Sequence, residues 1–259
     1  MQTELRGAKL HYEVYGETSN VPPLLLLHGW GCSVKHFSTI AEQMSSERMV
    51  VAVDFPAHGE SSKPAEPWGV PDFANLICDL IDELNIKGCD IIAHSFGGRV
   101  AIWIASQHPE YVGRMILTGC AGIKKEQTEE QKKKSSKYKK KKALIEKIGK
   151  IYGLKSLSEK ILKKLQTKYG SADYNALDDE MKKTFVKVIS QDLRPMLKEI
   201  KASVLLVWGE NDTETPLWMG QIMENEIKDA GLVVFENDDH FAYLRQWPRF
   251  VAVAKAFLK

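Results

Sequence analysis

The chain has 259 residues, of which 44% are hydrophobic and 27% are charged, and its formal net charge is +2. These values are typical of a soluble globular protein that is long enough for one large α/β domain. Because so small a net charge creates no global attraction to nucleic acid, we expect a small-molecule substrate and no nucleic-acid partner.

Short apolar segments, which predict strands, alternate with amphipathic segments, which predict helices. A hairpin is expected at residues 3–15, with its turn at Arg6-Gly7. The four leucines at 24–27 predict a strand that is buried on both faces. Further strands are expected at 49–53, 91–92, 115–118, 204–208 and 232–235, and helices at 36–44, 72–84, 97–107, 217–227 and 248–258. The alternation predicts an α/β fold with a mainly parallel, twisted sheet and helices on both of its faces.

This alternation stops after residue 122 and resumes at Val204. Residues 123–201 contain no convincing strand and read as helical, lysine-rich sequence. We therefore expect residues 1–122 and 202–259 to form the core. Residues 123–201 are expected to form a helical cap, or lid, over the carboxyl edge of its sheet.

Residues 124–142 hold ten lysines and three glutamates, a local charge of +7. Such a run could attract an anionic substrate, a membrane surface or RNA. The simpler interpretation is the solvated face of a cap helix. Tyr138 is the single aromatic residue of this run, and the scarcity of groups that stack on bases argues against nucleic acid.

The segment around Ser95 predicts a reactive serine. Its sequence Ala93-His94-Ser95-Phe96-Gly97 fits the nucleophile-elbow pattern Gly-x-Ser-x-Gly, with alanine in the first glycine position. A strand before the turn and a helix after it would place the Ser95 hydroxyl at the carboxyl edge of the sheet. The alternative is an ordinary strand–turn–helix with an exposed serine.

A serine hydroxyl becomes nucleophilic at neutral pH when an imidazole removes its proton and a carboxylate orients that imidazole. His240 is the only histidine after His108, and Asp212 follows an earlier strand at the same edge of the predicted sheet. We predict that Ser95, Asp212 and His240 are the catalytic residues. The competing interpretations are a surface histidine and a turn aspartate, and the other candidates for the acid are Glu210, Glu214, Asp238 and Asp239.

Two backbone N–H groups are needed to stabilise the oxyanion that forms during acyl transfer. The amide of Phe96, which follows the nucleophile, is one candidate. The amide of Trp30, in the glycine-rich turn His28-Gly29-Trp30-Gly31, is the other. The alternative for this turn is a plain loop.

No metal or cofactor is expected, because the chain has no His-Glu-x-x-His, no Cys-x-x-Cys and no glycine-rich phosphate loop. We interpret His28, His58 and His94 as structural hydrogen-bonding residues. Four cysteines without disulfide or metal spacing, no secretory signal and no apolar run long enough to cross a bilayer favour a cytoplasmic protein with reduced thiols.

Taken together, these motifs resemble the α/β-hydrolase superfamily, in its small capped esterase and carbon–carbon-bond hydrolase branch. The resemblance implies an α/β-hydrolase fold with a cap, a Ser95–Asp212–His240 triad in the family's chain order, and an oxyanion hole at Trp30 and Phe96. It departs from the usual pattern at Ala57, Ala93 and Asp239, where glycine is common. The matching segments are His28-Gly29-Trp30-Gly31, Asp54-x-Pro-Ala-His-Gly-x-Ser61, Ala93-His94-Ser95-Phe96-Gly97-Gly98, Trp208-Gly-Glu-Asn-Asp212-x-x-x-Pro216 and His240-Phe241.

The resulting hypothesis is a serine hydrolase of the carboxylesterase type, which cleaves an ester or a similar activated carbonyl through an acyl-enzyme. A serine at the elbow argues against dehalogenase or epoxide hydrolase chemistry, which starts from a carboxylate. Two alternatives stay open. One is a carbon–carbon-bond hydrolase or lyase that acts on an anionic substrate, and the other is a non-catalytic ligand-binding protein on the same fold.

Overall fold

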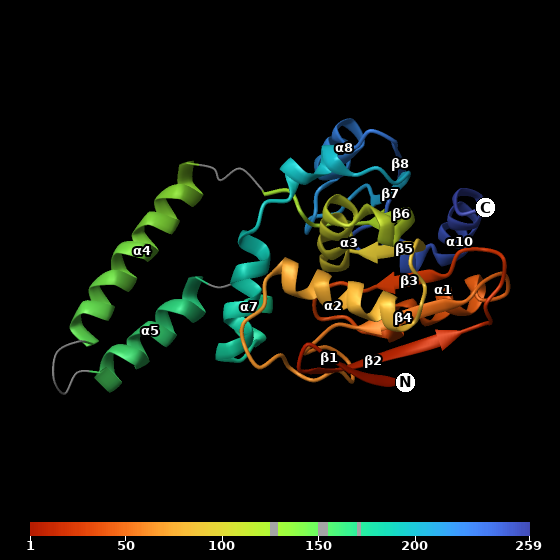
Figure 1. Cartoon of the computed structure of the whole chain (residues 1–259). Helices are drawn as coiled ribbons and strands as arrows, with labels where there is room; N and C mark the ends of the chain where they lie inside the picture. The colour runs from red at the N-terminus through yellow and green to blue at the C-terminus, as the bar shows by residue number, and fades with distance from the viewer. Residues whose placement is uncertain (125–128, 150–154, 170–171) are drawn as a thin grey trace. The chain divides into compact units, whose positions relative to one another are not determined.

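The computed structural model describes residues 1–124, 129–149, 155–169 and 172–259. In these residues eight strands form one sheet in the order β1-β2-β4-β3-β5-β6-β7-β8 (Figure 1). β2 pairs antiparallel with β1 and β4, whereas every pairing from β4 to β8 is parallel. The strands are β1 (Gln2–Leu5), β2 (Ala8–Tyr15), β3 (Leu24–Leu27), β4 (Val50–Asp54), β5 (Cys89–His94), β6 (Val112–Thr118), β7 (Val204–Gly209) and β8 (Ala230–Phe235).

The central strands are apolar along their whole length because both faces of the sheet are covered. Leu25 and Leu27 of β3 face one apolar core, and Leu24 and Leu26 face the other. Successive side chains of a strand point to opposite faces, so a strand between two cores needs a continuous apolar run. The strand predicted at 24–27 is confirmed, with all four leucines buried.

Helices on the two faces of the sheet complete these cores (Figure 1). α2 (Val70–Glu83), α3 (Phe96–Gln107) and α8 (Leu217–Glu226) bury their apolar sides in the first core. α1 (Ser38–Met44) and α10 (Trp247–Phe257) bury theirs in the second. The short elements η1 (Val34–Phe37), η2 (Pro109–Tyr111), η3 (Arg194–Glu199) and α9 (Ala242–Arg245) lie in the connections.

The chain divides into two compact units, one made of Met1–Lys124 with Val186–Lys259 and the other of Lys125–Phe185. The described residues from 123 to 201 contain helices and no strand, as the sequence pattern predicts. Their helices are α4 (Glu129–Gly149), α5 (Lys155–Tyr169), α6 (Ala172–Ala176) and α7 (Asp179–Ser190), and α4 packs against α5. Part of the predicted lysine-rich run, residues 125–128, lies outside the described residues. The role of this insertion as a cap stays a prediction.

Hydrogen bonds of the first unit tie the two ends of the insertion to α3 and to each other. The Leu193 N–H donates to the Gly122 carbonyl oxygen at 2.8 Å. The buried Arg99 guanidinium donates to the carbonyl oxygens of Val188 (3.2 Å) and Gln191 (2.9 Å). The insertion therefore leaves and rejoins the core beside α3, the helix that follows Ser95.

The four cysteines, Cys32, Cys78, Cys89 and Cys120, are free and buried. Burial raises the pKa of the Cys120 thiol to about 12, which keeps it protonated and unreactive at neutral pH. Among the helices that the structure describes, none is long and apolar enough to cross a bilayer.

Candidate active site

Ser95 lies at a sharp, strained turn between β5 and α3. Its backbone has φ 50° and ψ −107°, a positive φ that an L-residue rarely adopts. The turn is tight because α3 packs closely against its neighbours. A Cβ atom at Gly97 would lie 2.2 Å from the Leu27 carbonyl oxygen, and one at Gly98 would lie 2.2 Å from Cys120 Sγ. Ser95 is itself partly exposed, while the residues on both sides of it are buried.

The turn that carries Trp30 lies against the start of α3. The Gly97 N–H donates to the His28 carbonyl oxygen at 3.1 Å. The rings of Trp30 and Phe96 meet edge to face, with centroids 5.3 Å apart. The Phe96 amide opens α3, where N–H groups have no partner within the helix and the helix dipole favours negative charge. The structure therefore brings the two predicted oxyanion residues side by side.

His28 holds this turn in place with two hydrogen bonds of its imidazole ring. Its Nδ1 donates to the Gly29 carbonyl oxygen at 2.7 Å, and its Nε2 accepts the Phe55 N–H at 3.0 Å. Complete burial lowers the pKa of His28 to about 3, so the imidazole is neutral at physiological pH. The structural role predicted for His28 agrees with these hydrogen bonds.

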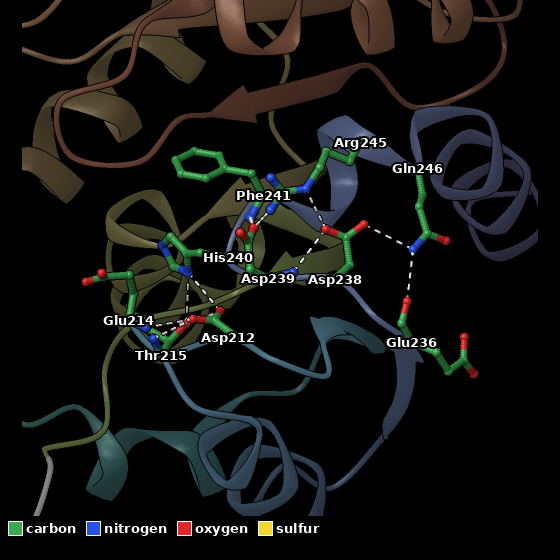
Figure 2. Close-up of polar contacts among 10 residues, drawn as sticks. All are labelled: Asp212, Glu214, Thr215, Glu236, Asp238, Asp239, His240, Phe241, Arg245 and Gln246. Atoms are coloured by element: carbon green, nitrogen blue, oxygen red, sulfur yellow. Dashed lines mark hydrogen bonds and ion pairs between the residues drawn. The ribbon is translucent and has the colours of Figure 1, made fainter.

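Asp212 and His240 form a hydrogen-bonded pair at the carboxyl edge of the sheet (Figure 2). Asp212 Oδ2 lies 2.8 Å from His240 Nδ1. Asp212 Oδ1 accepts the backbone N–H groups of Glu214 at 2.9 Å and Thr215 at 2.8 Å. The Asp212 side chain is fully buried, whereas the His240 side chain keeps 12% of its surface exposed. A buried carboxylate held in this way can fix the imidazole's orientation and stabilise its protonated form.

Thr215 is a third member of this cluster that the sequence interpretation missed. Its hydroxyl lies 2.8 Å from Asp212 Oδ2, 3.0 Å from the Gly119 carbonyl oxygen and 3.2 Å from His240 Nδ1. Figure 2 shows Thr215 and His240 converging on the same carboxylate. The spacing Asp-x-x-Thr is a turn signal in the sequence, but the contact with Gly119 joins residues that are 96 positions apart.

Gly119 is also part of the site. Its φ is +48°, and a Cβ atom there would lie 3.1 Å from His240 Nδ1 and 3.3 Å from Asp212 Oδ2. Both of these distances are tighter than ordinary van der Waals contact, so a side chain would press on the Asp212–His240 hydrogen bond.

The other acidic residues of these loops contact other partners (Figure 2). Asp238 accepts from Arg245 Nε at 2.7 Å and from Gln246 Nε2 at 3.0 Å. Asp239 forms an ion pair with the same arginine and accepts the Phe241 N–H at 3.0 Å. These contacts hold the loop that carries His240. Glu210 accepts the Asn237 N–H at 2.9 Å, and Glu214 is exposed.

His94 packs between the elbow and His240. Its ring centroid is 4.6 Å from that of His240, and its Nδ1 is 3.1 Å from the Thr118 carbonyl oxygen. Burial, and then the charge of His240, lowers the pKa of His94 well below its ordinary value. His94 therefore stays neutral and adds no positive charge beside His240.

The structure does not join Ser95 directly to His240. Among the described residues, the Ser95 hydroxyl makes no hydrogen bond. The backbone of Ser95 nevertheless lies beside the segment that contacts His240. The Ser95 N–H donates to the Thr118 carbonyl oxygen and the Ala121 N–H donates to the Ser95 carbonyl oxygen, at 3.1 Å each, and Gly119 between them lies against the His240 ring. Hydrogen bonds between catalytic groups are often long before substrate binds, and the role of Ser95 as the nucleophile stays a prediction.

The described part of the chain contains no cluster of three or more His, Cys, Asp or Glu residues that could hold a metal ion. Ser95, His240 and Asp212 supply a hydroxyl, an imidazole and a carboxylate in neighbouring loops of this edge. That set can carry out proton transfer and nucleophilic attack by its own side chains.

Comparison with known proteins agrees with this architecture. A family model described as alpha/beta hydrolase fold matches residues 22–245. Pimeloyl-[acyl-carrier protein] methyl ester esterase of Neisseria meningitidis is 25% identical over 248 residues, which cover 92% of this chain and 94% of that protein. An uncharacterized protein of Mycobacterium tuberculosis is 25% identical over 256 residues, covering 92% of this chain and 75% of that protein.

Solved structures share the fold at lower identity. An enol-lactonase from Burkholderia xenovorans superposes with a TM-score of 0.74 at 19% identity, covering 100% of this chain and 99% of that chain. A meta-cleavage product hydrolase from Pseudomonas fluorescens gives a TM-score of 0.73 at 20% identity, covering 99% and 96%. With the family model spanning most of its length, this chain belongs to the α/β hydrolase fold family.

Proposed function

We propose that this protein is a serine hydrolase that cleaves a carboxylic ester, or a similar activated carbonyl, through an acyl-enzyme. The observation that carries the proposal is the buried Asp212–His240 hydrogen bond of 2.8 Å, formed in the loops beside the strained turn at Ser95. The similarity to an esterase of Neisseria meningitidis favours an ester over other carbonyl substrates.

In the proposed mechanism, His240 Nδ1 stays bonded to Asp212, which leaves Nε2 to accept the Ser95 hydroxyl proton. Ser95 Oγ then attacks the carbonyl carbon, and the oxyanion is stabilised by the amides of Trp30 and Phe96. The proton on His240 passes to the leaving alkoxide as the carbon–oxygen bond breaks. His240 next takes a proton from water, the resulting hydroxide attacks the acyl-enzyme, and the acid is released as the proton returns to Ser95 Oγ.

The predicted cap belongs to this proposal. The insertion leaves the core after the carboxyl end of β6, the strand that pairs with β5 and so ends beside Ser95. We therefore propose that residues 123–201 are the cap of this hydrolase.

A substrate screen with matched variants tests the activity. We expect the wild-type protein to hydrolyse p-nitrophenyl esters of some acyl length, and Ser95→Ala and His240→Ala to fall to background. Ser106→Ala is the control, because Ser106 lies on the same helix and bonds to the Trp103 carbonyl oxygen, away from the site. It should keep full activity. If the wild-type protein hydrolyses no ester faster than Ser95→Ala, the ester hydrolase proposal is wrong.

The same screen distinguishes the second candidate reaction. The lysine-rich insertion favours anionic substrates, so carboxylated esters and anionic diketones that undergo carbon–carbon cleavage are included. Turnover of a diketone without ester hydrolysis would assign the site to carbon–carbon-bond cleavage. Tight binding of such compounds without any turnover would instead identify a ligand-binding protein.

A further inference from the structure

The positive charge of the chain is concentrated in residues 129–169, which hold the helices α4 and α5 and the sequence between them. Between residues 129 and 169 the sequence has fifteen lysines, four glutamates, no aspartate and no arginine, a local charge of +11. Since the whole chain carries +2, the remainder carries −9. The two helices pack against each other as a hairpin, which we call the α4–α5 hairpin (Figure 1).

Large aliphatic side chains are exposed on the same hairpin. Leu144 and Leu157 are 61% and 53% exposed, and Ile148 and Ile161 are 36% and 42% exposed. On each helix the two residues are four positions apart, which places them on one face. Leu144 and Ile148 lie in the last half of α4, and Leu157 and Ile161 lie in the first half of α5. All four therefore belong to the stretch around the connection between the two helices.

Lysines surround the apolar residues of α5. A groove of about 610 Å³ is lined by Leu157, Ile161, Lys160, Lys163, Lys164 and Lys168. Lysine stems can lie along an apolar surface while the ammonium groups reach outward to anions. This arrangement fits a binding partner whose surface is negatively charged and whose interior is apolar.

The composition of the hairpin indicates which anionic partner it fits. Arginine, which is enriched at protein–protein interfaces, is absent from residues 129–169, whereas lysine, which is depleted there, is abundant. The aromatic residues of the two described helices are Tyr138 and Tyr169, whose rings contact each other at 5.3 Å. Lysine charge combined with exposed aliphatic groups, without stacking groups directed outward, is the combination that binds anionic lipid surfaces.

We propose that the α4–α5 hairpin docks the protein on an anionic lipid surface. Leu144, Ile148, Leu157 and Ile161 enter the apolar boundary of the lipid layer, and the lysines contact its phosphate groups. Docking does not depend on the chemistry at Ser95, so Ser95→Ala should bind the surface as the wild-type protein does.

Sedimentation of the 259-residue protein with vesicles tests this. We expect binding to vesicles of equal parts phosphatidylglycerol and phosphatidylcholine, and at least about tenfold weaker binding to pure phosphatidylcholine or in high salt. Each lysine near an anionic surface strengthens binding about fivefold. The triple variant Lys160→Gln/Lys164→Gln/Lys168→Gln should therefore bind at least about tenfold more weakly. Its matched control removes three exposed lysines of the first unit and should bind normally: Lys35→Gln/Lys201→Gln/Lys228→Gln.

The apolar contribution is measured separately. Leu157→Ser/Ile161→Ser should weaken vesicle binding at least about tenfold, because two aliphatic side chains that docking buries in the lipid layer are lost. Val14→Ser, at a 39% exposed valine of β2, is the control and should have no effect. The proposal is overturned if both lipid compositions bind equally or if the triple lysine variant binds like the wild type. Binding to polyglutamate with none to anionic vesicles would also overturn it and would assign the hairpin to an acidic protein partner.

Discussion

Replacing Thr215 by valine removes one hydroxyl while keeping the shape of a buried side chain. That hydroxyl lies 2.8 Å from Asp212 Oδ2 and 3.0 Å from the Gly119 carbonyl oxygen. Its single proton serves one of these acceptors at a time. The variant leaves the Asp212–His240 hydrogen bond and the Thr215 backbone N–H in place, so it isolates the hydroxyl's contribution to the position of the carboxylate.

The expected loss follows from that geometry. A hydrogen bond to a charged group contributes about 1.5–3 kcal/mol, and a buried carbonyl without its partner costs a similar amount. We expect Thr215→Val to lower the free energy of unfolding by about 2 kcal/mol. If the same energy holds Asp212 in its reactive position, kcat/KM falls about ten- to a hundredfold. That is well short of the roughly ten-thousandfold loss expected when the carboxylate itself is replaced by an amide.

Ester hydrolysis and chemical denaturation measure the two effects independently. Thr215→Ser keeps the hydroxyl and is the matched control, and its kcat/KM should stay within about threefold of wild type. The reasoning is refuted if Thr215→Val keeps wild-type kcat/KM. It is also refuted if serine fails to rescue the activity, because the methyl group and not the hydroxyl would then matter.

Three further changes probe the same site. Gly119→Ala should reduce kcat/KM at least about tenfold, because its Cβ would lie 3.1 Å from His240 Nδ1. Gly88→Ala is the control, because Gly88 also has a positive φ but no atom lies within 4 Å of its Cβ. It should affect stability alone. Equal kinetic effects of the two would contradict this. Asp212→Asn should lower kcat by about four orders of magnitude. Asp239→Asn should lower kcat less than tenfold, because the Asp239 carboxylate pairs with Arg245. A larger loss in Asp239→Asn than in Asp212→Asn would assign the acid role to Asp239. Stability should also fall in acid, because the pKa of His28 is about 3 in the folded protein, below its unfolded value of 6.5. Between pH 3 and pH 6.5 His28 is protonated in the unfolded chain and neutral in the folded protein. The contribution of neutral His28 to the free energy of unfolding is therefore complete above pH 6.5 and is lost progressively below it. Burial also lowers the pKa of His94, which adds a loss of the same sign. Denaturation at pH 5 should therefore show at least about 2 kcal/mol less stability than at pH 8, and a flat profile would contradict the assignment.

Much of the fold could be predicted because burial on two faces leaves a clear signal in the sequence. The strand at 24–27 was predicted with its observed bounds, since Leu24 to Leu27 are all buried. The turn at Ser95 could be predicted because its small neighbours are required where α3 begins. The family model confirms the predicted superfamily and fold class.

The chain order Ser95, Asp212, His240 favours Asp212 as the acid, although nothing local distinguishes it from Asp238 and Asp239. The contacts that fix these side chains could not be predicted, because they join distant segments. The hydrogen bond to His240 and the pairing of the other two with Arg245 become visible when the loops meet at the sheet edge. Thr215 was missed for the same reason, because its partners lie on three different loops.

The central claim is that Ser95 is an activated nucleophile, and covalent labelling tests it most directly. Wild-type protein is incubated with a fluorophosphonate probe and analysed by intact-mass measurement and peptide mapping. The account predicts one adduct per chain, located on Ser95, and no adduct on Ser95→Ala. Folded protein that takes up no probe, or that carries the adduct on another residue, would contradict it.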